Sequence, residues 1–329
     1  MKKNFNYFFI VSIFLLLNSC SVDDSPFFDV DTTPPVIAEV TAVTTPSNDN
    51  TPDYTFSSTE SGYLYFEGSC SSSTTSASSG DNTITLNSLS DGTYSDCEIS
   101  VSDTAANESN SITLTSFSID STAATLIETS AIDSSTNDST PDYTFVSSEA
   151  GTITYSGSCS SITTSAIAGT NTITLNTLSD GTYSDCKITV TDSLDNAVTL
   201  NISSFEIDTL APTVTSFATT ADNQSAVAIT DNMTVIFSEK IDIATVTTNS
   251  DNTSCSGTLR VSSDNFSSCI QMSSSSPVST DNISFTLDPS NNLTGGTTYL
   301  TKITTGVTDS AGNALSSQYD NSTGFTTAD

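Results

Sequence analysis

The feature that most constrains the fold is an internal repeat with a constant offset of 89 residues. The segment Asn48–Phe56 returns as Asn137–Phe145, and Leu89–Cys97 returns as Leu178–Cys186. Because the offset stays the same from one matched segment to the next, no residue is gained or lost between them. We therefore expect two copies of one module with one shared fold.

Within each copy, apolar side chains alternate with polar ones. Tyr54 and Phe56 flank Thr55, and Ile99 and Val101 flank Ser100. A period of two predicts strands that bury one face and expose the other, and Ser-Gly and Asp-Gly pairs between these runs predict turns. No segment after the N-terminal apolar run has a helical period. We predict an all-β chain of tandem immunoglobulin-like β-sandwiches, each with about six or seven short strands.

The chain has seven cysteines, and six of them fall into three local pairs. The pairs are Cys70 with Cys97, Cys159 with Cys186, and Cys255 with Cys269. The first two pairs are related by the repeat offset, so we expect one disulfide inside each copy and a third between the remaining two. A zinc site is the alternative, but the chain has no histidine and no Cys-x-x-Cys motif.

The N-terminus carries two lysines followed by the apolar run Phe8–Leu17, which only Ser12 interrupts. This length suits a signal peptide better than a membrane span. The run ends in Leu-Asn-Ser-Cys, which resembles a lipobox, the site where bacteria acylate a cysteine and cleave before it. We predict a lipoprotein signal peptide over residues 1–19, lipidation of Cys20 and a tether over 20–30. An ordinary secretory signal is the alternative.

The residues after Cys20 bear on the destination of the chain. Ser21 stands where an aspartate retains Gram-negative lipoproteins at the inner membrane, so we expect the outer membrane. Asp23 and Asp24 resemble the signal that exports lipoproteins of Bacteroidetes-like bacteria to the cell surface, although a solvated tether explains them as well. The alternative location is the periplasm, where the chain would act as a spacer.

The charge of the chain limits its partners. It has 6 basic and 38 acidic residues, and removal of the signal peptide leaves 4 against 38, a formal charge of −34. Such a surface repels phosphate, so we expect no nucleic-acid partner. It also repels anionic lipid, so we expect the acyl chains to supply the attachment to the membrane.

Three phrases give the first two modules a family resemblance. They are a linker such as Asp31–Pro35, then Asn-Asp-Asn-Thr-Pro, then Asp-Gly-Thr-Tyr. Over residues 31–208 the chain resembles bacterial Ig-like repeat modules of surface proteins and adhesins. It departs from antibody domains because Tyr94 precedes Cys97 by three residues and not by two. If both side chains are buried, a β-bulge should lie between them.

The last module has a different pattern. Its linker is Asp208–Val214, Phe-Ser-Glu ends at Glu239, and Val-Thr-Asp-Ser-Ala-Gly-Asn ends at Asn313. This order resembles the Ig-like domain family named after S-layer proteins, which implies a structural or adhesive role without catalytic residues. The segment Cys255–Cys269 departs from that family, and we expect a bridged hairpin or loop there. The predicted modules are residues 31–119, 120–208 and 209–329.

The many acidic side chains could serve catalysis or calcium binding. Because the chain has no histidine, the common serine and cysteine catalytic triads are excluded. Paired carboxylates could still act as an acid and a base, but a pair repeated at an 89-residue offset does not suit a single active site. We therefore expect no enzyme and no cofactor. Calcium is the exception to be considered, because oxygen ligands recur near the linkers. The candidates are Asn48, Asp49, Asp53, Asn137, Asp138, Asp142, Asp120 and Asp208. Turn formation is the alternative explanation.

The sequence therefore predicts a lipid-anchored, non-enzymatic rod of three Ig-like sandwiches with a structural or adhesive role at the outer membrane, exposed at the surface. The alternative is a module that binds a carbohydrate or a protein there. The sequence contains no motif that identifies a ligand.

Overall fold

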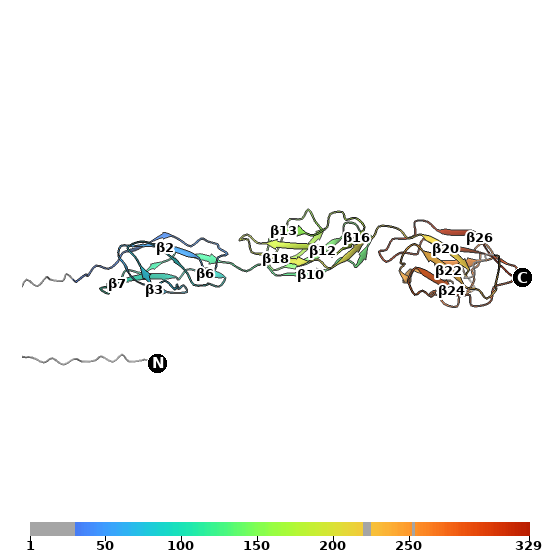
Figure 1. Ribbon diagram of the computed structural model, residues 1–329, viewed down its shortest axis with the longest axis horizontal. Coiled ribbons are helices and arrows are strands. Elements are labelled where there is room, and N and C mark those ends of the chain that lie inside the picture. The colour runs from blue at the N-terminus through green and yellow to red at the C-terminus, as the bar shows by residue number, and fades with distance from the viewer. Residues whose placement is uncertain (1–29, 220–224, 252–253) are drawn as a thin grey trace, which may run out of the picture. The chain divides into compact units, whose positions relative to one another are not determined.

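The computed structural model describes residues 30–219, 225–251 and 254–329 (Figure 1). The predicted signal peptide, Cys20 and residues 20–29 of the tether lie outside this range, so their predictions stay open. Apart from η1, a 3-10 helix at Ile243–Thr245, every regular element in the described part is a strand, which confirms the all-β class. None of the described residues forms a helix long and apolar enough to cross a membrane.

The chain divides into two compact units, and we describe each by itself. The first holds residues 50–118 with the preceding segment up to Thr45, and the second holds 46–49 with 119–329. The first repeat copy lies mainly in the first unit. The second copy and the remaining chain lie in the second unit.

The first copy has two principal sheets and a short pair of strands. One sheet has the order β1 (Ile37–Thr41), β2 (Asp53–Ser58), β5 (Gly80–Thr85). The other has the order β4 (Ser76–Ala77), β3 (Gly62–Glu67), β7 (Glu98–Asp103), β8 (Ile112–Thr113). The pair joins β6 (Gly92–Tyr94) to β9 (Phe117–Ile119). The alternating apolar residues are buried as expected, since Phe56 and Val101 are fully shielded from solvent.

The second copy repeats this arrangement. Its sheets are β10 (Leu126–Ser130), β12 (Asp142–Ser147), β15 (Gly169–Thr174), and β14 (Ser165–Ala166), β13 (Gly151–Ser156), β17 (Lys187–Thr191), β18 (Ala197–Asn201). The third is β11 (Ser135–Thr136), β19 (Phe205–Ile207), β16 (Gly181–Tyr183). Tyr54 faces Ile84 in the first copy, and Tyr143 faces Ile173 in the second. Because even the strand register is conserved at the 89-residue offset, both copies share one fold.

The condition for a β-bulge before the late cysteine is not met, because Cys97 is buried and Tyr94 is only half-buried. Tyr94 donates a hydrogen bond from its hydroxyl to the carbonyl of Ser90 at 2.7 Å and stacks on Phe117 at 5.3 Å between ring centroids. Residues 95–97 belong to no strand, and β7 begins at Glu98 in another sheet. The parity between Tyr94 and Cys97 therefore changes because the chain passes from one sheet to the next.

The last module packs two sheets around its own core. One sheet is β20 (Val214–Thr219), β22 (Met233–Phe237), β24 (Ser284–Leu287). The other is β21 (Ser225–Val227), β26 (Tyr319–Thr327), β25 (Thr298–Ile303), β23 (Leu259–Ser262). Val235 and Phe285 from the first sheet and Val261 and Phe325 from the second belong to one buried cluster.

The six cysteines of the described part form three disulfides in the expected pairs. Cys70–Cys97 and Cys159–Cys186 each join residues 27 positions apart with Cα atoms 5.2 Å apart. Cys255–Cys269 joins residues 14 positions apart. The first two link the end of β3 or β13 to the start of the neighbouring strand, β7 or β17. A 27-residue closed loop stabilises a fold by about 3 kcal/mol, mainly by restricting the unfolded chain.

The double substitution Cys70→Ser with Cys97→Ser should lower the free energy of unfolding of the first copy by about 3 kcal/mol. Urea unfolding followed by tyrosine fluorescence measures this loss. Cys159→Ser with Cys186→Ser is the matched variant and should cause a similar loss in the second copy. An unchanged urea midpoint in both variants would show that the bridges do not stabilise the modules.

Candidate functional site

A short loop after β7 fixes the start of the first copy. The Asp103 carboxylate accepts hydrogen bonds from the backbone N–H groups of Ala105 and Asn107, both at 2.8 Å. The Asn107 amide donates to the other Asp103 oxygen at 2.8 Å and to the carbonyl of Asp31 at 3.0 Å. A single asparagine therefore links this loop to the linker residue that leads into the module.

The same loop recurs in the other two modules. Asn196 donates to Asp192 and to the carbonyl of Asp120, and Asn313 donates to Asp309 and to the carbonyl of Asp208. The residue before each asparagine has a positive φ, 67° at Ala106, 68° at Asp195 and 93° at Gly312. Only Gly312 takes this left-handed conformation without a Cβ clash. The Asp-x-x-x-Asn phrase thus forms one structural clamp three times.

A glutamate adds a third carboxylate to this clamp. Oxygen atoms of Asp31, Glu60 and Asp103 lie within 4.8 Å of one another, as do those of Asp208, Glu239 and Asp309. The two clamp aspartates, Asp103 and Asp309, are buried. In the second copy the equivalent residues line an open cavity of about 490 Å³. They are Asp120, Glu149 and Asp192.

Hydrogen bonding and burial shift the pKa values of three of these carboxylates in different directions. The Asn107 side chain is the main cause that holds the pKa of Asp103 below its usual value. At Asp192, burial tends to raise the pKa, but hydrogen bonds from Asn196 and from backbone groups lower it overall. At Glu239, burial and the nearby charges of Asp208 and Asp309 raise the pKa. Asp103 and Asp192 are therefore stabilised in the charged form, whereas the charged form of Glu239 is disfavoured.

Three carboxylates that converge within 4.8 Å are oxygen ligands of the type that Ca²⁺ prefers. Without a cation, the repulsion between these carboxylates lowers the stability of the folded module. This arrangement is therefore the candidate cation site of the chain.

The structure changes the set of residues that the sequence suggested for calcium. Asp208 belongs to a cluster, and Asp120 lines the equivalent cavity. Asp53 instead accepts a cross-strand hydrogen bond from the Thr85 hydroxyl at 2.6 Å, and Asp138 accepts from the backbone N–H of Thr140 at 2.8 Å. These contacts fit the alternative explanation, turn and strand-edge hydrogen bonding.

The glutamates and the clamp aspartates were missed by the sequence analysis. The signal that could have found them is the recurrence of Asp-x-x-x-Asn in three modules. The missed residues are Glu60, Asp103, Glu149, Asp192, Glu239 and Asp309.

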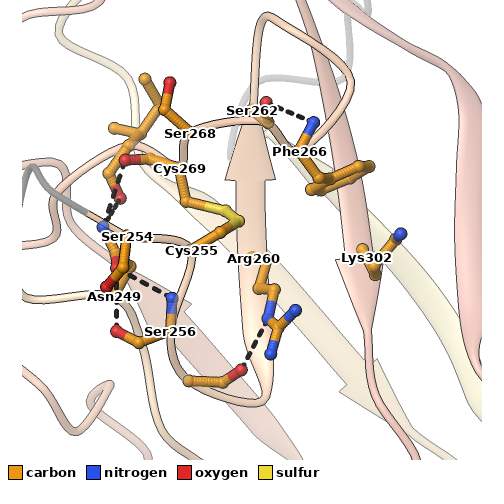
Figure 2. The surroundings of a disulfide bond; sticks show 12 residues. Asn249, Ser254, Cys255, Ser256, Arg260, Ser262, Phe266, Ser268, Cys269 and Lys302 are labelled. Carbon is orange, nitrogen blue, oxygen red and sulfur yellow. Dashed lines mark hydrogen bonds between the residues drawn. A yellow bond between two sulfur atoms is a disulfide. The ribbon is translucent and has the colours of Figure 1, made fainter.

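The segment Cys255–Cys269 contains β23 and is closed by the disulfide between its two ends (Figure 2). The buried Asn249 anchors it, because its amide donates to the carbonyl of Cys269 at 3.1 Å and its oxygen accepts from the Ser256 hydroxyl at 2.8 Å. Asp264 accepts hydrogen bonds from the Ser268 hydroxyl and backbone, which lower the pKa of Asp264 to about 2. The loop is thus fixed at both ends by polar contacts and a disulfide.

This loop presents an aromatic ring beside a cation. Asn265 and Phe266 have φ values of 57° and 63°, a strained conformation for side chains with a Cβ. The Lys302 ammonium lies 4.1 Å from the Phe266 ring centroid and 3.5 Å from a carboxylate oxygen of Asp320. Figure 2 shows the Lys302 and Phe266 side chains beside each other. These three side chains and Asn321 line a small cavity of about 230 Å³.

Comparisons with known proteins support the fold of the last module. Residues 208–327 match the model of a bacterial Ig-like domain. No curated protein sequence matches the chain.

Two solved structures are similar to the chain at low identity. One is SGBP-B of the Bacteroides ovatus mixed-linkage glucan utilization locus, in complex with a mixed-linkage heptasaccharide. The match has 13% sequence identity and a TM-score of 0.22, and it covers 88% of this chain and 70% of that chain. The other is E. coli alpha-2-macroglobulin, with 8% identity, 91% of this chain and 23% of that chain covered, and a TM-score of 0.20.

Glu239→Gln should raise the melting temperature at pH 7 by about 2 °C in the presence of a chelator, because it removes one charge from the repulsive cluster. The pKa of Glu239 is raised in the folded state, so its unfavourable contribution is present at neutral pH and fades as the pH falls through the folded pKa. The advantage of the variant should therefore shrink as the pH falls from 7 towards the unfolded value. Thermal melts of Glu206→Gln, an exposed site on β19, provide the control. Equal shifts in both variants would contradict the argument.

Proposed function

We propose that this chain is an exported, non-enzymatic envelope protein whose Ig-like modules act as a structural or adhesive element, attached to the outer membrane through lipid on Cys20. The observation that carries the proposal is the recurrence of one clamp at the start of each module. A carboxylate cluster lies beside the clamp in the first copy and in the last module. A catalytic centre is a single constellation with assigned roles, whereas a structural device is repeated with the module that it holds together.

The absence of histidine from the sequence supports the non-enzymatic part of this proposal, because it removes the most common general base. The three disulfides support export, since such bonds persist in oxidising compartments. The apolar N-terminal run that ends at Cys20 supports the lipid anchor.

Display of a binding module is the second candidate, and the cavity beside Phe266 favours it. The cavity combines an aromatic ring, the Lys302–Asp320 pair and the Asn321 amide. A few polar groups around an apolar surface are typical of small ligand sites. The ligand would then be held by the last module.

Lipidation and surface display can be tested together in the native host. Cells expressing the full chain should incorporate labelled palmitate into it, and proteinase K added to intact cells should degrade it. Cys20→Ser should abolish the label and release the chain from the membrane fraction. Label on the Cys20→Ser variant would contradict lipidation at this residue. Degradation only after permeabilisation of the outer membrane would contradict surface exposure and place the chain in the periplasm.

A calcium-bound form of the same modules is favoured by the carboxylate clusters. Calcium at 100 times its Kd would stabilise a module by about 2.7 kcal/mol, so the melting temperature should rise on addition of calcium and fall with a chelator. Glu60→Gln should remove this response from the first unit without breaking the Asn107 clamp. Asp53→Asn is the control and should keep the response. A melting transition that is the same with calcium and with chelator would exclude the calcium-bound form.

A further inference from the structure

Two tyrosines lie exposed on the outer face of the sheet β4-β3-β7-β8. Tyr63 is 60% exposed and Tyr65 is 53% exposed. Alternate residues of a strand point to the same face about 7 Å apart, so the two rings are neighbours on it. Adjacent exposed aromatic side chains on a sheet face are typical of an interaction surface.

Three glutamates surround these rings on the same face. Glu67 follows Tyr65 with the same parity on β3, and Glu98 lies directly opposite Glu67 on β7. Like charges directly opposite each other destabilise a sheet. Glu108 pairs across from Ser102, which itself lies opposite Tyr63, and accepts a hydrogen bond from the Ser100 hydroxyl at 3.2 Å.

The part of the first unit that the structure describes has no basic residue to neutralise that charge. The sequence contains no lysine or arginine between Lys3 and Lys187. The described part of the first unit therefore supplies no counter-charge of its own to the tyrosine face.

The second copy shows that the fold does not need this surface. At the offset of 89 residues, the outward positions hold Thr152, Thr154, Ser156, Lys187 and Ala197 in place of the two tyrosines and three glutamates. The inward positions keep their apolar character. They are Leu64 and Ile153, Ile99 and Ile188, Val101 and Val190. One scaffold thus carries an aromatic, acidic face in one copy and a polar face with a lysine in the other.

We propose that the face formed by Tyr63, Tyr65, Glu67, Glu98 and Glu108 binds a basic protein segment through its arginine or lysine side chains. A guanidinium group stacks on tyrosine rings and forms paired hydrogen bonds with carboxylates. The unneutralised glutamates attract a cationic partner and disfavour an acidic one. This inference goes beyond the structural role and does not depend on the lipid anchor.

Two other occupants fit the face less well. A neutral oligosaccharide could stack on the rings, but it would leave the three carboxylates without a counter-charge. A second copy of this chain would bring a formal charge of −32 to an acidic face and would be repelled.

The decisive variant replaces Tyr63 and Tyr65 with the threonines that the second copy carries. Tyr63→Thr with Tyr65→Thr leaves the net charge unchanged and uses residues that this scaffold already accommodates. The probe is a fluorescein-labelled octa-arginine peptide, and its binding to the full chain is measured by fluorescence anisotropy at about 0.15 M salt. We expect the double variant to bind about tenfold more weakly than the native chain.

Charge is tested with a matched pair of single variants. Glu67→Ser on the tyrosine face should weaken peptide binding, whereas Glu206→Ser on β19 of the second copy makes the same change in net charge and should leave binding nearly unchanged. Thermal melts confirm that all variants fold.

Several outcomes would overturn the proposal. Equal peptide affinity of the native chain and the tyrosine variant would show that the peptide is held by the overall negative charge of the chain and not by the tyrosine face. Tyrosine-dependent binding of a neutral cello-oligosaccharide, without peptide binding, would assign the face to sugar. Tyrosine-dependent dimerisation in analytical ultracentrifugation would assign it to a second copy.

Discussion

The structure of each repeat copy depends on two sheets that bury a shared layer of alternating side chains. In the second copy, Tyr143 and Phe145 from one sheet and Ile188 and Val190 from the other belong to a single buried cluster. The period of two decides which residues enter that layer, because a shift of register by one residue would expose the whole apolar set. The disulfides, the hydrogen bond of Tyr94 to Ser90 and the linker clamps all act on strands whose positions depend on this layer.

The carboxylate clusters show how the modules tolerate a very acidic composition. Each clamp aspartate is surrounded by donors, namely two backbone N–H groups and an asparagine amide, so its charge is compensated inside the loop. In the last module the neighbouring Glu239 is in a different situation, because burial and the charges of Asp208 and Asp309 raise its pKa. A carboxylate held by three donors therefore lies next to one whose charged form is disfavoured.

Much of the fold followed from the sequence because its signals were local or repeated. Strand positions, the duplication and the cysteine pairs could be read from alternation and spacing. The clusters could not, since Asp31, Glu60 and Asp103 are far apart in sequence and meet only when the linker folds back onto the loop after β7. The opposite parity of Tyr94 and Cys97 could not be explained from the sequence, because parity along a chain does not reveal a change of sheet. The positive φ of Phe266 could not be predicted from the sequence either, because it arises within the disulfide-bridged segment Cys255–Cys269.

The distribution of basic residues has a consequence for how long the chain would survive outside the cell. Trypsin-like proteases cut after lysine or arginine in segments that can be drawn out as an extended strand into their cleft. The first candidate bond after Lys3 follows Lys187, which lies in the hydrogen-bonded strand β17, and Arg260 and Lys302 lie in β23 and β25. Only Lys240 stands outside a strand in the described part of the chain. Digestion by such enzymes would therefore have to await local unfolding at three of the four basic residues in the described part of the chain, the exception being Lys240.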